Sequence, residues 1–389
     1  MKKLSEKQKK HFFPLERKKR WKQLCAARIK KHKERLQKQL TVKDRVINAD
    51  YYKTLEQRKQ LREFLYKKTK YEEPPLTVGI SDEFGIENEN GIIYFLDKAA
   101  SFIDFKSSEL IFDLKNCTRV WPSAIILLCS LKQWVELTSN PGKTPKLASS
   151  NSDSSKVNSY LAHCGFYDYV GRPKDTIDSS YSDKEVVKIQ RETKTKNIEQ
   201  REEDIIKLLE EYSDLCKEDL ELFNCVILTE IFNNVTEHGI SHIDRGWWLL
   251  AQRHEQHKII SLCIADNGIG IRHSLMTGPQ RDEIGKKVQN TTLNDGEFIK
   301  LALEENVSGS IYASIKTEGI IRKKYESGAR RGNGLKRIEK ACKNLKIPLS
   351  IISHYGYVFL DEYGKMINYG ARKTRVFSGT MYHLVIKCK

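Results

Sequence analysis

A helical pattern with three polar side chains on one face is the feature that most limits how this chain can fold. It lies in the sequence LTEIFNNVTEHG. Glu230, Asn234 and His238 follow one another at intervals of four residues, a spacing that places them along one face of a helix. A carboxylate, an amide and an imidazole aligned in this way can hold a metal-bound phosphate and polarise a water molecule. The apolar residues would cover a different, core-facing side: Leu228, Ile231, Phe232 and Val235.

Three glycine-containing segments follow this helix. The run from Ile259 to Ala265 is a candidate buried strand that ends on Asp266 and opens into Asn267-Gly268-Ile269-Gly270. Further on, Arg331-Gly332-Asn333-Gly334-Leu335 opens a second helical pattern. Ser378-Gly379-Thr380 then precedes a strand candidate. Glycines at the start of a helix let backbone N–H groups approach and bind phosphate, so these segments indicate a phosphate-containing ligand.

In this order the four segments resemble those of the GHKL ATPase superfamily, which includes gyrase, heat-shock chaperone, histidine kinase and mismatch-repair ATPases. Glu230, Asn234 and His238 are similar to its N box, and Gly379-Thr380 is similar to the Gly-Thr that closes its site. Asp266-x-Gly268-x-Gly270 and Gly332-x-Gly334-Leu335 resemble its two glycine boxes. A single GxG is common, whereas four motifs in the order of the family make a specific signal.

The resemblance implies a role for each of these residues. Glu230 would be catalytic, as the general base for the attacking water, and Asn234 would supply an oxygen to Mg²⁺. Asp266 would accept a hydrogen bond from the adenine amino group, and His238 would lie near the phosphates. Residues 272–331 would form a mobile lid over the triphosphate. The remaining positions would bind ATP: Gly268, Gly270, Gly332, Gly334, Leu335, Gly379 and Thr380.

Each motif also has an interpretation that involves no ligand. Glu230 could be a carboxylate on a helix surface, and His238 could cap the end of its helix through the dipole. Asp266-Asn267-Gly268 is also a turn signal, and Gly332 and Gly334 could simply start a helix. A dinucleotide-binding loop is less favoured, because the turn lacks the third glycine that would open a helix.

The positive charge of the chain is concentrated at its N-terminus. The 389 residues have a formal net charge of +17, and residues 1–70 contain 25 Lys and Arg against 7 Asp and Glu. We expect residues 1–75 to form a basic helical arm. It would be a solvated arm, a segment that binds nucleic acid through counterion release, or a contact for a partner protein.

A change of pattern after Glu73-Pro74-Pro75 predicts a small α/β domain over residues 76–172. Strand candidates at 91–95 and 109–114 precede an apolar helix, SAIILLCSLKQWVEL. The region resembles the STAS-like domains that accompany ATPases of the anti-sigma class. Phosphorylated members place a Ser in an Asp-Ser-Ser-Gly turn. Because the turn here is Trp121-Pro122-Ser123-Ala124, we interpret Ser123 as a helix cap.

The polar residues 173–203 are predicted to be a linker, and residues 204–389 a GHKL-type ATP-binding domain. Helices are expected at 205–216 and 219–238, on one face of a mixed sheet. The expected fold class is therefore α/β, with a two-layer α/β sandwich in the C-terminal domain. The strands of that sheet are expected at 246–252, 258–266, 349–353, 357–360 and 380–386.

Cysteines and hydropathy exclude several classes of protein. The nine cysteines form no CxxC pair, so neither a zinc site nor a disulfide framework is indicated. No apolar run approaches the roughly 18 residues of a membrane span, and the N-terminus lacks the apolar core of a signal peptide. We expect a cytoplasmic protein that does not associate with membranes.

Together these features predict a Mg-ATP-binding regulatory switch or slow ATPase whose lid would control a protein partner. The chain ends nine residues after Thr380, so the second domain that supplies a catalytic Lys in gyrase-type members is not expected. No helix pair with a phosphorylatable His is recognisable before Glu230. The alternatives are a serine/threonine protein kinase of the anti-sigma type and a nucleic-acid-associated module anchored by the basic arm. A homodimer is left open.

Overall fold

The structure is a computed structural model in which the chain divides into two units, Met1–Arg58 and Lys59–Lys389. All described residues belong to the second unit. The predicted basic arm (1–75) and the strand predicted at 91–95 lie outside the described residues. No helix among the described residues combines the length and the apolar character needed to cross a bilayer. The described residues are 76–80, 83–86, 109–138, 146–150, 152–170, 185–192, 197–235, 246–277, 284–285, 293–304, 307, 334–372, 376–377 and 379–389.

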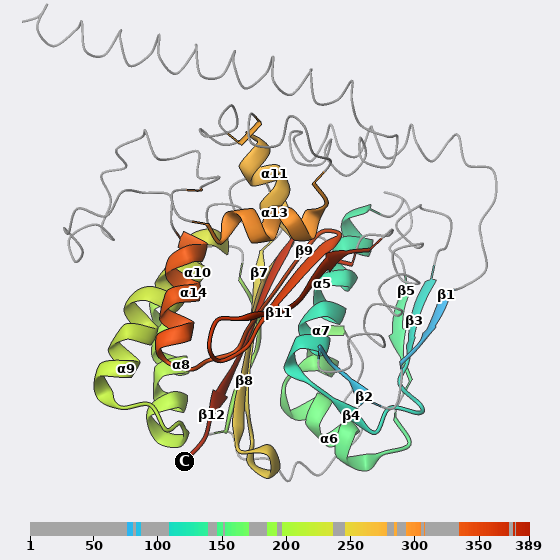
Figure 1. The fold of residues 1–389 in the computed structure, drawn as a ribbon. Coiled ribbons are helices and arrows are strands. Elements are labelled where there is room, and N and C mark those ends of the chain that lie inside the picture. Colours follow the sequence, from blue (N-terminus) through green and yellow to red (C-terminus); the bar gives the residue numbers. More distant parts are fainter. Residues whose placement is uncertain are drawn as a thin grey trace, which may run out of the picture. The chain divides into compact units, whose positions relative to one another are not determined.

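A seven-stranded sheet with the order β11-β10-β9-β12-β8-β7-β6 forms the centre of the C-terminal half (Figure 1). The sheet expected from the sequence is mixed, but neighbouring strands in this sheet are antiparallel throughout. Short connections between β7 and β8 and between β9 and β10 favour this arrangement, because parallel neighbours need long crossovers. The strands are β6 (Val186–Glu192), β7 (Trp247–His254), β8 (Ile259–Asp266), β9 (Leu349–Ser353), β10 (Gly356–Leu360), β11 (Met366–Ala371) and β12 (Thr380–Lys387).

Strand β6 lies within the range 173–203, which the sequence predicts to be a linker. Val186 and Val187 are buried and enter hydrophobic clusters on opposite faces of the sheet. Residues 186–192 are thus an edge strand rather than part of a linker. Pairing with β7 stabilises this short segment, which is otherwise rich in charged residues.

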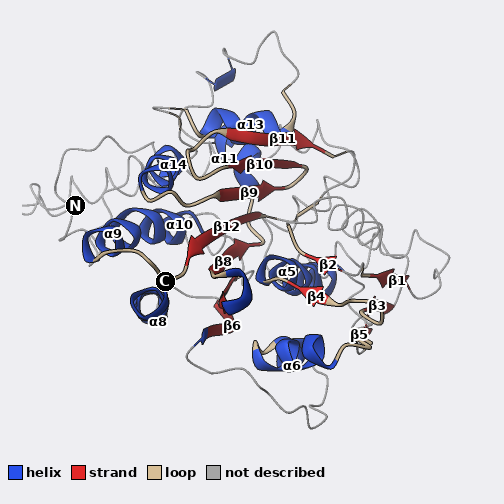
Figure 2. Ribbon diagram, turned by 60° about the horizontal axis from the view of Figure 1, so that its bottom comes forward, coloured by secondary structure: helices blue, strands red, loops and turns tan. Residues whose placement is uncertain are grey.

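Helices cover both faces of the sheet: helices of the C-terminal region pack on one face, and α5, from the region that precedes it, packs on the other. Figure 2 shows α8, α9, α10 and α14 along one side of the strands and α5 on the other. The helix predicted over 219–238 is divided into α, π and α segments. The helices of the first side are α8 (Ile198–Tyr212), α9 (Lys217–Leu222), the π-helix η4 (Phe223–Leu228), α10 (Thr229–Asn234) and α14 (Gly334–Asn344).

Strand β7 shows why a second layer is needed. Trp247 and Leu249 pack with the helices of the first side, whereas Trp248 and Leu250 pack with α5 (Pro122–Thr138). All four side chains are fully buried. A strand that is buried on both faces has a continuous apolar sequence rather than an alternating one. The run WWLLA therefore requires cover on both sides, and α5 provides it on the second side.

The region that precedes the large sheet consists of short strands and helices, and we call it the small α/β unit. A three-stranded parallel sheet has the order β1-β3-β5. Ser123, in the first turn of α5, is fully buried, and its hydroxyl accepts a hydrogen bond from the Ile86 amide at 3.2 Å. The other elements are β1 (Leu76–Gly79), β2 (Glu83–Phe84), β3 (Glu109–Asp113), β4 (Arg119–Val120), β5 (Lys146–Ser149), α6 (Ser155–His163) and α7 (Phe166–Val170).

Part of the predicted lid, 272–331, belongs to the folded body. Helix α11 (Gly270–Thr277) extends into the beginning of this range, and α13 (Asp295–Ala302) packs against β10 and β11. Asn294 and Glu297 form a capping box at the start of α13. Phe298 is buried, and a Cβ on Gly296 would lie 2.2 Å from the Gly370 carbonyl oxygen. Residues 293–304 are therefore packed tightly, whereas most of the other residues of the predicted lid are outside the described ones.

Candidate functional site

Helix α10 presents Glu230 and Asn234 as the sequence predicts. Ile231, Phe232 and Val235 are buried in the core, while Glu230 and Asn234 are only partly buried. The π-helical turn η4 directly precedes this helix. Such turns are rare and are found frequently at functional sites. His238 lies outside the described residues.

The start of α14 lies beside Glu230 and Asn234 of α10. A Cβ on Gly334 would lie 3.1 Å from Glu230 Oε2 and 3.8 Å from Asn234 Oδ1. The missing side chain therefore leaves room beside the carboxylate and the amide oxygen. Arg337, one turn further along α14, forms an ion pair with Glu230 Oε1. Leu335 packs against the core, and Gly332 lies outside the described residues.

Asp266 is the last residue of β8, and its side chain lies on the face of the sheet that α10 covers. Leu262 and Ile264, four and two residues earlier in the strand, pack with the helices of that layer. Side chains two residues apart share a face of a strand, so the Asp266 side chain is directed to that layer as well. It is 2% exposed, and its Oδ1 accepts a hydrogen bond from the Gly268 amide at 2.5 Å.

The Gly-Thr segment lies directly beside this aspartate. Thr380 is the partner of Asp266 in the register of β12 and β8. A Cβ on Gly379 would lie 2.1 Å from the Asp266 carbonyl oxygen and 2.5 Å from the Gly268 amide nitrogen. Only glycine permits this approach, because such short contacts with backbone atoms would force the backbone to move. The segment from Asp266 to Gly268 and the Gly379-Thr380 segment are therefore packed against each other.

Tyr382 contacts α10 through Asn234, and no motif in the sequence identifies this tyrosine. Asn234 Nδ2 donates a hydrogen bond to the Tyr382 hydroxyl at 3.2 Å. Burial raises the pKa of Tyr382 most, the negative charges of Asp266 and Glu230 raise it further, and the hydrogen bond from Asn234 lowers it. The hydroxyl therefore lies within the field of both carboxylates. Only its position in the sequence could have identified it: Tyr382 is two residues after Thr380, so the two side chains lie on the same face of β12.

Ser353 is a second residue of this end of the sheet that the motifs do not include. Its hydroxyl accepts a hydrogen bond from the Ile271 amide at 2.9 Å and donates to the Gly379 carbonyl oxygen at 3.1 Å. Its Oγ also lies 3.3 Å from Thr380 Oγ1. Ser353 therefore ties the start of α11 to the start of β12. Gly270, the first residue of α11, has a φ of +71°, which favours glycine.

The predicted residues within the described part of the chain thus meet at one end of the sheet, from four separate segments. They place carboxylates, an amide oxygen and glycine backbone near one another. Among the described residues there is no cluster of three His, Cys, Asp or Glu side chains that could hold a metal ion by itself. A magnesium ion here would need oxygen atoms from its ligand and from water in addition to Asn234.

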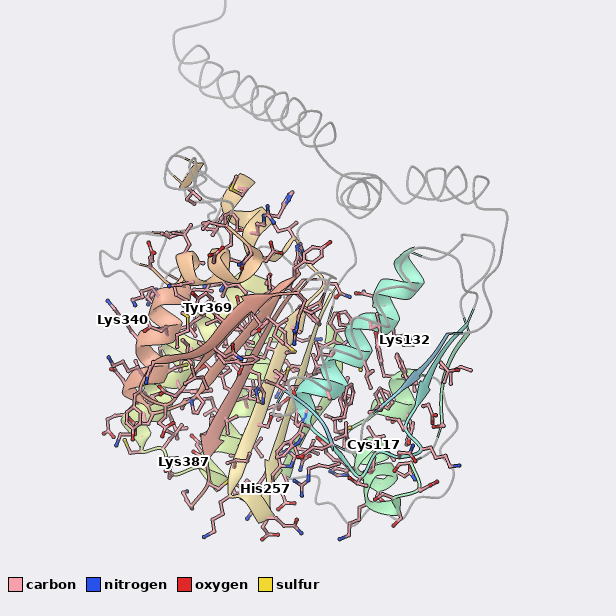
Figure 3. All side chains as sticks on the ribbon, turned by 45° about the vertical axis from the view of Figure 1, so that its right-hand side comes forward. Cys117, Lys132, His257, Lys340, Tyr369 and Lys387 are labelled. Carbon is pink, nitrogen blue, oxygen red and sulfur yellow. The ribbon has the colours of Figure 1, made fainter. Side chains whose placement is uncertain are left out.

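A cavity of about 450 Å³ lies at the other end of β8, near the β7–β8 connection. The length of β8 separates the two ends, and seven steps of about 3.3 Å along a strand correspond to about 23 Å. Figure 3 labels His257 at this end and Lys132 further along α5. The ring centroids of Trp121 and His254 are 4.7 Å apart within the cavity lining. The two sites are therefore distinct.

In comparisons with known proteins, no family model, curated protein or solved structure matches this chain. Its function is consequently inferred from the residues and from their geometry.

Proposed function

We propose that residues 204–389 bind Mg-ATP and act as a regulatory switch or slow ATPase of the GHKL type, preceded by a STAS-like domain. The observation that carries this proposal is the convergence of Glu230, Asn234, Gly334, Asp266 and Gly379 at one end of the sheet. These residues come from four segments that the family resemblance identifies independently of the fold. A turn signal or a helix start alone would not bring the segments together.

The adenine would be recognised by Asp266. Its carboxylate is almost completely buried, and one of its oxygens already accepts a hydrogen bond from the Gly268 amide. A buried carboxylate is stabilised by further donors, and the amino group of adenine is such a donor. Guanine carries a carbonyl oxygen at the corresponding position, which would face the carboxylate unfavourably. The proposed site is therefore selective for adenine.

The phosphate end would lie between α10 and α14. The backbone at Gly334 begins a helix, where N–H groups and the dipole favour anions. Asn234 Oδ1 would contribute an oxygen ligand to Mg²⁺, which would neutralise phosphate charge. Glu230 would accept the proton of the attacking water. Because Arg337 pairs with one oxygen of Glu230, it competes with that water, and this competition supports slow turnover.

Calorimetry with Mg-ATP on the full chain tests the proposal, with Asp266→Asn as the variant. Asparagine keeps the oxygen that accepts the Gly268 amide but loses the charged acceptor for adenine. A hydrogen bond to a charged group contributes about 1.5–3 kcal/mol, so we expect the affinity for ATP to fall about 10- to 150-fold. Asp153→Asn, at an exposed position outside the site, is the matched control and should bind as the wild type does.

Measurement of phosphate release on the same samples distinguishes a switch that only binds ATP from an enzyme that hydrolyses it. Glu230→Gln should keep ATP binding and lose the slow release. Labelled phosphate that appears on protein instead of in solution would favour the kinase alternative. Equal affinities of wild type and Asp266→Asn for ATP would overturn the assignment of the adenine site.

A further inference from the structure

Asn267 lies between Asp266 and Gly268, yet its side chain forms hydrogen bonds on the face of the sheet opposite to that of the Asp266 side chain. It is fully buried and forms hydrogen bonds with α5. Its Nδ2 donates to the Ser130 carbonyl oxygen at 3.1 Å and to Gln133 Oε1 at 2.7 Å. Its Oδ1 accepts from the Ser130 hydroxyl. Ser130 and Gln133 are each 1% exposed.

These contacts join segments that are far apart in the sequence. Helix α5 belongs to the small α/β unit, and it packs along β7 and β8. Cys263 and Ala265, the residues of β8 that precede Asn267 on this face, lie in the same hydrophobic cluster as Ile125 and Leu128. The strand end thus carries Asp266 toward one layer and Asn267 toward the other. A shift of α5 must therefore move the backbone that carries Asp266, or break buried hydrogen bonds.

We propose that Asn267 is a positioning residue that couples the adenine end of the nucleotide site to α5, so that the small α/β unit regulates ATP affinity. This inference rests on the proposed function. Coupling between two sites is reciprocal: if the position of α5 changes ATP affinity, then bound ATP holds α5 more firmly. A partner that displaces α5 would release the nucleotide, and ATP would oppose that partner.

The coupling is specific to the adenine end. Helix α14, whose start would bind phosphate, packs in the hydrophobic cluster on the other side of the sheet from α5. Loss of the contact between Asn267 and α5 should therefore weaken the binding of ATP more than the binding of magnesium tripolyphosphate, which has no adenine. A general loss of structure would weaken both ligands alike, so the comparison separates a positioning role from a purely structural one.

The experiment uses the full chain with Gln133→Met, which removes the Oε1 acceptor on α5 without touching the proposed nucleotide site. Lys132→Met, at the neighbouring position on the same helix, is the matched control, because Lys132 lies over the Tyr169 ring instead. We expect Gln133→Met to bind Mg-ATP at least tenfold more weakly, with an unchanged affinity for magnesium tripolyphosphate. Lys132→Met should bind both ligands as the wild type does.

Hydrogen exchange supplies the reciprocal measurement. ATP should slow amide exchange in residues 122–133 of the wild type and should leave it unchanged in Gln133→Met. Ser130→Ala, a smaller change that removes the hydroxyl donor, replaces Gln133→Met if that variant does not fold. Equal ATP affinities of wild type and folded variant, or equal weakening of both ligands, would overturn the coupling alone. A wild-type chain that binds no Mg-ATP would overturn the proposed function and the coupling with it.

Discussion

Two histidines with little access to solvent should make this protein sensitive to mild acid. His383, on β12, is 2% exposed, and its Nε2 lies 2.8 Å from the Ser261 hydroxyl oxygen. Burial lowers the pKa of His383 to about 4. Burial is also the main reason why the pKa of His254, on β7, is lowered to about 3, and electrostatic interactions with His257, His383 and Arg119 lower it further. Both imidazoles are therefore neutral in the folded protein above about pH 5.

The sign and size of the effect follow from proton linkage. In the unfolded chain both side chains titrate near a pKa of about 6.5, so between pH 6.5 and the native pKa values the unfolded state binds more protons. The contribution of these two neutral histidines to stability is therefore complete above about pH 6.5 and falls as the pH decreases. At pH 5, about 1.5 units below the unfolded pKa, each histidine costs about 2 kcal/mol. The two together cost about 4 kcal/mol, a large part of the 5–15 kcal/mol typical of a domain.

Urea unfolding at pH 7.5 and pH 5.0 measures this loss, with His383→Gln and His254→Gln as variants. Glutamine keeps a polar side chain but does not titrate, so each variant should lose about 2 kcal/mol less than the wild type between the two pH values. Gln256→Asn, at an exposed position and without a titrating group, is the control and should show the wild-type loss. If the difference between the two pH values were the same in all four proteins, burial of neutral imidazoles would not be the cause.

Two further predictions concern the proposed nucleotide site. Gly379→Ala should lower ATP affinity more than tenfold and lower the melting temperature, because the added Cβ would lie 2.1 Å from the Asp266 carbonyl oxygen. Calorimetry measures the affinity, and thermal unfolding measures the melting temperature. Gly79→Ala, whose added Cβ meets nothing within 4 Å, is the control and should change neither value. Arg337→Gln should raise the rate of phosphate release a few-fold, because it frees the Glu230 carboxylate from its ion pair; a release rate equal to or below that of the wild type would show that Arg337 does not restrain Glu230.

Local patterns are sufficient to predict several elements of this protein. The four-residue spacing of Glu230 and Asn234 on a helix, the apolar run of β8 and its end at Asp266 depend only on neighbouring residues. The apolar helix after Pro122 is predictable for the same reason. Helical and strand periods are properties of the backbone, so the order of residues along a segment is enough to recognise them.

The partners of these elements were decided by the tertiary structure. Strand β6 is not predictable from its charged sequence, because pairing with β7, rather than its own composition, makes this segment a strand. Ser353 enters the site because its register with β12 places it beside Thr380 and Gly379. Tyr382 enters it because α10 brings Asn234 to its hydroxyl. The sequence determined which side chains share a face of one element. Which faces meet was decided by non-local packing, since α5 and β8 bury apolar surface that neither can bury alone.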